Sequence, residues 1–226
     1  MIISIMINLF LFKKLNHHVV VIVMSTADIK QLYMNGVKPS PDETAIWWRW
    51  VLSIPKPDNP LRGGSITKNQ DQSFLCLACT GGPACTGGGE DHNRLFNIKA
   101  VDAGKDILVP IFSTEYSTAE LGANATHDQL LSHAKEDVNN ALLELIIDSV
   151  PLQNLEQYYV ESGPFEVRLP PNHILENNIE PGTYQAACAG YYLKLNHLPR
   201  GRHTIKFGGT GQNGFHTSVT YVLNSP

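Results

Sequence analysis

The sequence is short of charge, and it has no excess of positive charge. Charged residues make up 17% of the 226 residues, and 17 Lys and Arg stand against 21 Asp and Glu, for a formal net charge of −4. Proteins dedicated to binding nucleic acid carry a stripe rich in Lys and Arg. No such stripe is present, so no nucleic-acid partner is expected.

No apolar run is long enough to span a bilayer by itself. Residues 1–12 and 19–24 are apolar, but basic and histidine residues at 13–18 separate them. A spanning helix needs about 18 to 20 apolar residues, and a secretory signal places its positive charge before its apolar run. We therefore interpret residues 1–23 as an extension outside the mature protein, with translation from Met24 and a cytoplasmic location. The alternative is that the segment is retained, and that the protein is membrane-associated or exported.

The familiar catalytic motifs are missing as well. The sequence contains no nucleophile elbow, no phosphate-binding loop and no dinucleotide-binding fingerprint. This favours a non-catalytic protein that binds a ligand or a protein partner. Two alternatives stay open: a metal-dependent enzyme whose site is built from dispersed Glu, His and Cys residues, and a membrane-associated structural protein anchored by residues 1–23.

Glycine and proline are abundant, with 18 Gly and 14 Pro, which indicates many turns. The 42% hydrophobic content is enough to build a core. A continuous apolar run at 107–112 is typical of a strand covered on both faces, and several later segments alternate between apolar and polar residues. The alternating segments are 94–101, 165–169, 203–207 and 215–223, and a long strand is expected over 184–195. The pattern predicts a mainly β, antiparallel sandwich or jelly-roll domain over residues 61–226.

Two or three peripheral helices are predicted. Residues 24–60 form a helical segment packed on the domain, with one helix at 27–34 and another at 43–53 that is capped by Asp42 and ended by prolines. Thr126 and Gln129 form a capping box for a helix over about 126–141. Residues 142–147 then favour a strand that enters a hairpin.

Three sequence blocks carry a resemblance. They are Trp47-Trp48-x-Trp50-x-x-Ser53-Ile54-Pro55, then Gly-Lys-Asp-Ile-Leu-Val-Pro-Ile at 104–111, and Leu198-Pro199-x-Gly201-x-His203-Thr204-Ile205-x-Phe207-Gly208-Gly209. Together they resemble a group of hypothetical prokaryotic proteins of about this size. The resemblance implies a sandwich-like architecture and brings no established activity, so it assigns no catalytic residue. The Cys/Gly-rich loop at 76–89 departs from the group.

That loop holds the most unusual local pattern, Cys76-x-x-Cys79-x5-Cys85 followed by His92. Three thiolates and one imidazole are a ligand set suited to zinc, so these four residues are a candidate metal site. The alternatives are a surface loop with free thiols or with a disulfide between Cys79 and Cys85. Cys188, which lies between two alanines, is expected to be a small buried residue.

Glu115 and His203 are the candidate catalytic residues. A carboxylate just after a buried strand is well placed to line a pocket, and His203 shares a strand face with Ile205 and Phe207. If both met, with or without His92, they could form an acid–base or metal site. Otherwise His203 is a structural histidine, and Glu115 caps a turn or pairs with an arginine.

Three tryptophans crowd one predicted helix, at positions 47, 48 and 50. They could form an aromatic platform for a sugar or an apolar ligand. Because each Trp can bury a large area, we favour a helix that plugs one end of the sandwich. The three cannot share one helical face, so at least one is expected to be exposed or to pack on a different element.

Overall fold

The structure is a computed structural model, and it describes residues 9–15, 18–24, 36–78, 92–97, 102, 104–175, 178–196 and 198–226. The described residues of the N-terminal segment form strands β1 (Leu9–Leu15) and β2 (His18–Met24), which pair as an antiparallel hairpin. The helix predicted at 27–34 lies outside the described residues. None of the helices in the described ranges combines the length and the apolar composition that crossing a membrane requires.

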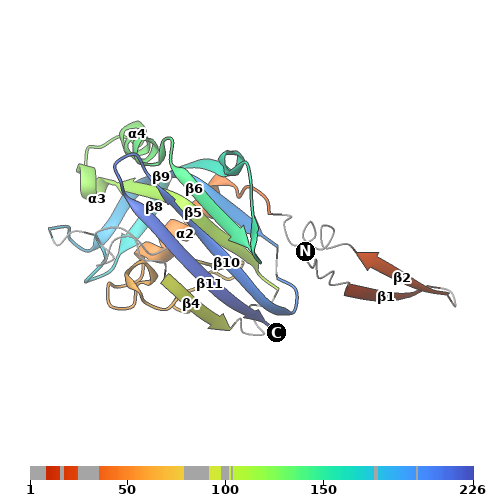
Figure 1. The fold of residues 1–226 in the computed structure, drawn as a ribbon. Coiled ribbons are helices and arrows are strands. Elements are labelled where there is room, and N and C mark those ends of the chain that lie inside the picture. Colours follow the sequence, from red (N-terminus) through yellow and green to blue (C-terminus); the bar gives the residue numbers. More distant parts are fainter. Residues whose placement is uncertain are drawn as a thin grey trace.

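Two sheets form the main body (Figure 1). One has the strand order β4-β11-β10-β6-β7, and the other has the order β3-β5-β9-β8. Their bounds are β3 Phe74–Cys76, β4 His92–Asn97, β5 Asp106–Ser117, β6 Leu142–Ile147, β7 Val150–Pro151, β8 Tyr159–Leu169, β9 Gly182–Leu195, β10 Gly201–Thr210 and β11 His216–Ser225. The prediction of a mainly β, sandwich-like fold with few helices is confirmed.

Both sheets are mixed rather than wholly antiparallel. β3 pairs with β5 in parallel, and β4 pairs with β11 in parallel. The remaining pairs in the two sheets are antiparallel. Parallel neighbours require a long connection between the paired strands, and the local alternation of residues carries no signal for such a distant pairing.

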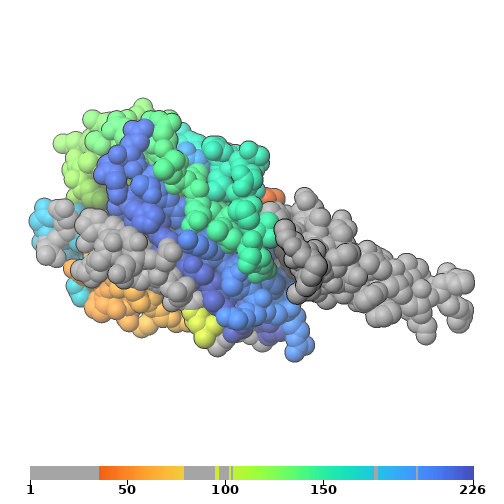
Figure 2. All heavy atoms as spheres, in the orientation of Figure 1, coloured from red at the N-terminus to blue at the C-terminus, as the bar shows by residue number. Residues whose placement is uncertain are grey.

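The core lies between the sheets. One buried cluster contains side chains from β5 and β9 of the four-stranded sheet and from β10 and β11 of the five-stranded sheet. Val219, Tyr221 and Leu223 are completely buried, as expected for one face of the alternating segment predicted at 215–223. Phe215, at the start of that segment, precedes β11 and is 36% exposed. In Figure 2, β10 and β11 lie at the surface of the face in view, next to the segment that contains β6.

The first described helix, α2 (Pro41–Leu52), begins two residues earlier than predicted. Its N-cap is Ser40 rather than Asp42, because Pro41 suits the first helical turn and the Ser40 hydroxyl accepts a hydrogen bond from the Glu43 amide. The Glu43 carboxylate in turn accepts from the Ser40 amide at 2.7 Å, which completes a capping box.

The other two described helices are α3 (Thr118–Leu121) and α4 (His127–Val138). The capping box predicted from Thr126 and Gln129 starts α4. The helix ends at Val138 rather than near 141, because Asn139 is extended. α4 packs across β9 and β5, and α2 packs against β8 and β9.

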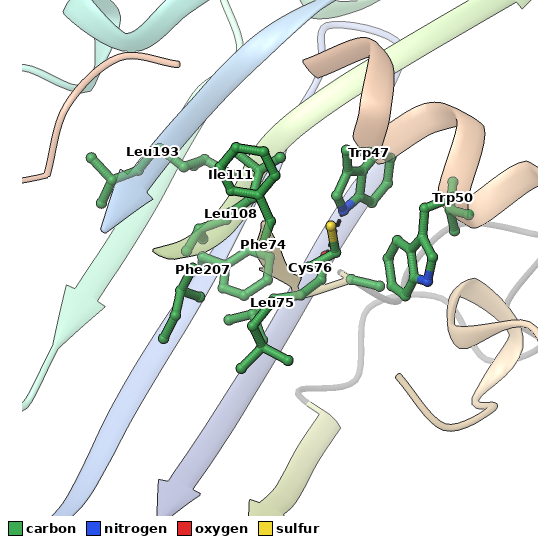
Figure 3. Packing of buried hydrophobic residues seen from close by; sticks show 14 of the residues in the cluster. Trp47, Trp50, Phe74, Leu75, Cys76, Leu108, Ile111, Leu193 and Phe207 are labelled. Atoms are coloured by element: carbon green, nitrogen blue, oxygen red, sulfur yellow. Dashed lines mark hydrogen bonds between the residues drawn. The ribbon is translucent and has the colours of Figure 1, made fainter. Parts of the chain in front are cut away.

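All three tryptophans of α2 are buried, with exposed fractions of 2%, 8% and 4% for Trp47, Trp48 and Trp50. Each indole N–H donates to a different segment: Trp47 to the Leu77 carbonyl at 2.6 Å, Trp48 to the Tyr192 hydroxyl at 2.8 Å, and Trp50 to the Lys68 carbonyl at 2.8 Å. Figure 3 shows Trp47 and Trp50 within the buried cluster. The helix therefore contributes core packing, and its tryptophans contact different elements, as predicted.

Candidate functional site

Glu115 lies inside β5 and not after it. The predicted strand at 107–112 continues to Ser117, because residues 112–117 keep pairing with β9. Glu115 is opposite Cys188 of β9, and its side chain is only 6% exposed. The Glu115 carboxyl group is therefore held within the protein.

The second half of β5 has a free edge. β3 pairs only with Asp106–Leu108, and no other described strand pairs with Pro110–Ser117 on that side. Pro110 fits such a place because it has no amide hydrogen to donate to a neighbouring strand. A bulge between Pro110 and Phe112 interrupts the register with β9 on the other side.

A cavity of about 330 Å³ borders this edge. Six consecutive residues of β5, Pro110 to Glu115, line it. Because successive side chains of a strand point to opposite faces, six residues in a row can line one cavity only where the edge of the strand faces it. The other described lining residues are Trp47, Trp48, Leu52, Leu61, Arg62, Glu120, Asp137, Val138, Ile174, Leu175, Asn213, Phe215 and Thr217.

Burial dominates the chemistry of the Glu115 carboxyl group. It raises the pKa of Glu115 well above the ordinary value of 4.5, and the negative charge of Glu120 raises this pKa further. A hydrogen bond with the Ser117 side chain acts in the opposite direction. In the described structure the Oε1 atom of Glu115 has no hydrogen-bond partner. The surroundings of Glu115 therefore favour the protonated form of its carboxyl group, and one of its oxygens has no partner among the described residues.

Two further carboxylates line the cavity, and both accept hydrogen bonds from neighbours. Glu120 accepts from the Ser117 amide at 2.9 Å and from the Ser117 hydroxyl at 2.8 Å. Asp137 accepts from the Tyr116 hydroxyl at 2.9 Å. The pKa of Tyr116 is raised to about 12, first by burial and then by this hydrogen bond to Asp137. These bonds fix both carboxylates at the cavity wall.

Arg62 supplies the only guanidinium among the described lining residues. Arg62 is the last residue of the short helical turn η1 (Pro60–Arg62), where the Asn59 side chain accepts a hydrogen bond from the Leu61 amide. The Nη2 atom of Arg62 donates to the Ile174 carbonyl at 3.1 Å. Arg62 therefore joins η1 to the segment at 174–175, and both belong to the cavity wall.

His203 is held by two partners at the far end of its own strand hairpin. Its Nδ1 lies 2.8 Å from Asp148 Oδ2, and its Nε2 lies 3.0 Å from the Pro199 carbonyl oxygen. The Asp148 hydrogen bond raises the pKa of His203, although burial acts to lower it. His203 is not among the described residues that line the cavity, whereas Glu115 is. These contacts favour the interpretation of His203 as a structural histidine.

The cysteine pattern is described only in part. Cys76 is completely buried, and Figure 3 shows it in one cluster with Trp47, Trp50 and Phe74. Burial raises the pKa of the Cys76 thiol, and the charge of Asp71 raises it further. A metal ligand must be a thiolate, so this environment acts against metal binding by Cys76.

The rest of that pattern, Cys79, Cys85 and the side chain of His92, lies outside the described residues, and the metal site stays a prediction. Among the described side chains, no group of three His, Cys, Asp or Glu residues could hold a metal ion. Cys188 is completely buried, and burial raises its pKa to about 12, which confirms the interpretation as a core residue.

Sequence reasoning missed most of the cavity wall. Glu120 could have been found, because Ser117 and Glu120 have the spacing of a capping box, and the structure forms that box at the start of α3. Asp137 adjoins the buried face of α4, next to Val138. Phe215 and Arg62 carry no local signal, because only the fold brings their segments to β5.

Comparisons with known proteins add nothing to this site: no protein-family model, no curated protein and no solved structure matches the chain. The function of the protein is therefore inferred from the residues of the cavity.

Proposed function

We propose that the protein binds a small, largely apolar molecule with one polar end in the cavity beside the free edge of β5, and that it does not transform this molecule. The supporting observation is Glu115, a residue of the cavity wall whose buried carboxyl group has one oxygen without a hydrogen-bond partner. Buried polar atoms in folded proteins are nearly always hydrogen-bonded, and leaving one unsatisfied costs about 1–3 kcal/mol. A ligand that supplies the missing partner removes this cost.

The size and lining of the cavity define the rest of the ligand. Its volume of about 330 Å³ is at the small end of the range for ligand sites, which is roughly 300–1,000 Å³. The rings of Trp47, Trp48, Phe112 and Phe215 line it together with aliphatic side chains. This lining suits a compact apolar body, such as one aromatic ring with a short side chain.

The chemical groups around the cavity support binding rather than reaction. Its described lining contains no His, Lys or Cys. Nucleophilic catalysis needs an activated nucleophile beside a base, and two hydroxyl groups at or next to the wall are engaged with the carboxylates of Asp137 and Glu120. Thr114 donates to Asp137 at 3.4 Å, and Ser117 donates to Glu120 at 2.8 Å. A non-catalytic binding protein is thus the better supported of the two classes.

Isothermal titration calorimetry with 2-phenylethanol tests this proposal. We expect saturable binding of one molecule per chain. Phe215→Ala is expected to weaken binding about three- to tenfold, because it removes apolar contact with the ring. Since Phe215 is 36% exposed, this variant should still fold.

Leu142→Ala is the matched control. Leu142 is 77% exposed and does not line the cavity, so the loss of its side chain should leave the affinity unchanged. Absence of saturable heat in the native protein would contradict the proposal. So would an equal loss of affinity in both variants, because the binding would then not depend on the cavity.

A further inference from the structure

The polar groups of the cavity are mainly acidic. Glu115 of β5, Glu120 of α3 and Asp137 of α4 all line it, and Arg62 is the only positively charged side chain among the described lining residues. Arg62 already donates to the Ile174 carbonyl. Three carboxyl groups from three different elements therefore share the cavity wall with one guanidinium, and aromatic rings make up much of the remaining wall.

On the basis of the proposed function, we propose that the polar end of the ligand is a protonated amine, so that the protein is a receptor for a small organic cation with an apolar body. An ammonium group can donate to the unpartnered Oε1 of Glu115. It is also attracted by the negative charges of Glu120 and Asp137. Hydrogen bonds between charged groups are roughly twice as strong as neutral ones, and the faces of Trp and Phe rings attract cations further.

A neutral ligand matches this cavity less well. An alcohol or carbonyl group could pair with the Glu115 carboxyl group, but it would leave the negative charge of Glu120 and Asp137 uncompensated in a partly enclosed space. The Oε1 atom is also shielded from water in the empty cavity. The proposal therefore requires the carboxyl group to turn toward the ligand, and a cation attracts it more strongly than a neutral group does.

Binding of a cation should be coupled to loss of a proton. A positive charge beside Glu115 lowers the pKa of that carboxyl group, whereas a neutral ligand does not. The titratable and charged groups around Glu115 are Glu120 from α3, Asp137 from α4, Arg62 from η1 and Cys188 from β9. The pKa of Cys188 is raised to about 12 and arginine stays charged, so Glu115, whose pKa burial raises, is the group expected to release the proton.

The test is calorimetry with two matched probes, 2-phenylethylamine and 2-phenylethanol, near neutral pH in two buffers of different ionisation enthalpy. The amine is expected to bind at least about tenfold more tightly than the alcohol. Binding of the amine should also release up to one proton per chain, and binding of the alcohol should release none. In Glu115→Gln the advantage of the amine and its proton release should both disappear, while binding of the alcohol remains.

Two further variants make the result specific. Asp137→Asn removes a carboxylate at the cavity wall outside β5, and it should weaken the amine but not the alcohol. It serves this purpose even where Glu115→Gln fails to fold. Glu144→Gln is the matched control. The Glu144 carboxylate lies 3.0 Å from the Lys206 ammonium group, and Glu144 does not line the cavity. This variant should leave both affinities unchanged.

The outcomes separate the two proposals. If the alcohol binds and the amine binds equally or more weakly, the cation proposal is overturned and the proposed binding function stands. If neither probe binds, both proposals are overturned. If the amine binds tightly but Glu144→Gln weakens it as much as Asp137→Asn does, the attraction is a general surface effect, and the cation proposal is again overturned.

Discussion

Glu115 keeps its proton in the folded protein at pH values where the unfolded chain has lost it. Its folded pKa lies above the ordinary 4.5, with burial as the main cause. A group with a raised folded pKa contributes stability that is fully present below the unfolded pKa and is lost as the pH rises toward the folded pKa. Above about pH 4.5 the native protein should therefore lose about 1.4 kcal/mol of stability per pH unit from this residue.

Glu115→Gln is predicted to remove this loss. The variant should become more stable relative to the native chain as the pH rises above about 4.5, because glutamine does not titrate. Urea unfolding at several pH values measures the difference. Glu144→Gln, whose side chain is 48% exposed, is the control and should show no such divergence. Parallel pH profiles for the native chain and Glu115→Gln would contradict the raised pKa.

The pair of His203 and Asp148 should stabilise the fold over a limited pH window. Burial acts to raise the pKa of Asp148, but the hydrogen bonds from His203 and Thr204, together with the charge of His203, lower it overall, and the pKa of His203 is raised. The stability that Asp148 contributes is fully present above pH 3.8, and it is lost as the pH falls through the lowered folded pKa of Asp148. The contribution from His203 is present below 6.5 and is lost as the pH rises through its raised folded pKa.

His203→Gln is predicted to flatten the loss of stability between about pH 6 and about pH 8. The effect should be at most about 1 kcal/mol, because the Asp148 side chain is 35% exposed and its ion pair is screened by water. Thermal unfolding across this range measures it. An unchanged slope would show that the pair does not bind a proton more tightly in the folded state.

Cys76 and Cys188 are predicted to be unreactive in the folded protein. Both are completely buried, and burial raises the pKa of both thiols. In a Cys79→Ser/Cys85→Ser double variant, neither remaining thiol should react with a thiol reagent near pH 8 until the protein is unfolded. Reaction of either thiol in the native state would contradict their place in the core.

The same double variant tests the metal hypothesis. Near-stoichiometric zinc in the native protein that is lost in the variant would establish the site predicted from Cys76, Cys79, Cys85 and His92. Elemental analysis without zinc in either protein would reject it.

At the scale of single elements, the turn between β6 and β7 is strained. Asp148 and Ser149 both have positive φ, at 48° and 68°, in a two-residue hairpin turn. Asp148 has a compensating role, because its carboxylate accepts hydrogen bonds from His203 and from the Thr204 amide, the latter at 2.7 Å. Ser149 has no such role in the described contacts, and glycine is the residue favoured at the second position of this turn.

Ser149→Gly is therefore predicted to stabilise the protein by about 0.5–1 kcal/mol. The midpoint of urea unfolding should rise, with an unchanged dependence on denaturant. Asp148→Gly is the matched comparison and should destabilise, since it removes the carboxylate that holds His203 and Thr204. If Ser149→Gly destabilises, the turn conformation assigned here is wrong.

Strong local patterns predicted several elements well. The capping box of Thr126 and Gln129 gave the start of α4, and the continuous apolar run at 107–112 gave the first half of β5. The second half of β5 was missed because Ser113 to Ser117 are mostly polar, and only their pairing with β9 keeps them extended. The parallel pairs of β3 and β4 were also missed, because such pairings depend on distant segments.

At the scale of the whole molecule, the cavity is a product of tertiary structure. Its wall combines α2, η1, β5, α3, α4, the segment at 174–175 and the β10–β11 connection. The sequence singled out Glu115 as a residue that could line a pocket, and Glu115 does line the cavity. No local pattern could show that Asp137 or Phe215 joins it, because these residues meet β5 only after the sheets and helices have packed.

The arrangement of the tryptophans gives the cavity its own reporters. The chain has three Trp, and all of them lie on α2. Trp47 and Trp48 line the cavity, whereas Trp50 does not and donates instead to Lys68 at 2.8 Å. Each has an indole N–H that gives a separate resonance in a proton–nitrogen NMR spectrum. Two signals therefore monitor the cavity, and the third is an internal control.

The most direct test of ligand binding in the cavity is to follow these three indole resonances while 2-phenylethanol is added. We predict saturable shifts for Trp47 and Trp48 with one common dissociation constant, and little or no shift for Trp50. No shift at Trp47 and Trp48, or equal shifts at all three residues, would contradict a ligand site at the free edge of β5.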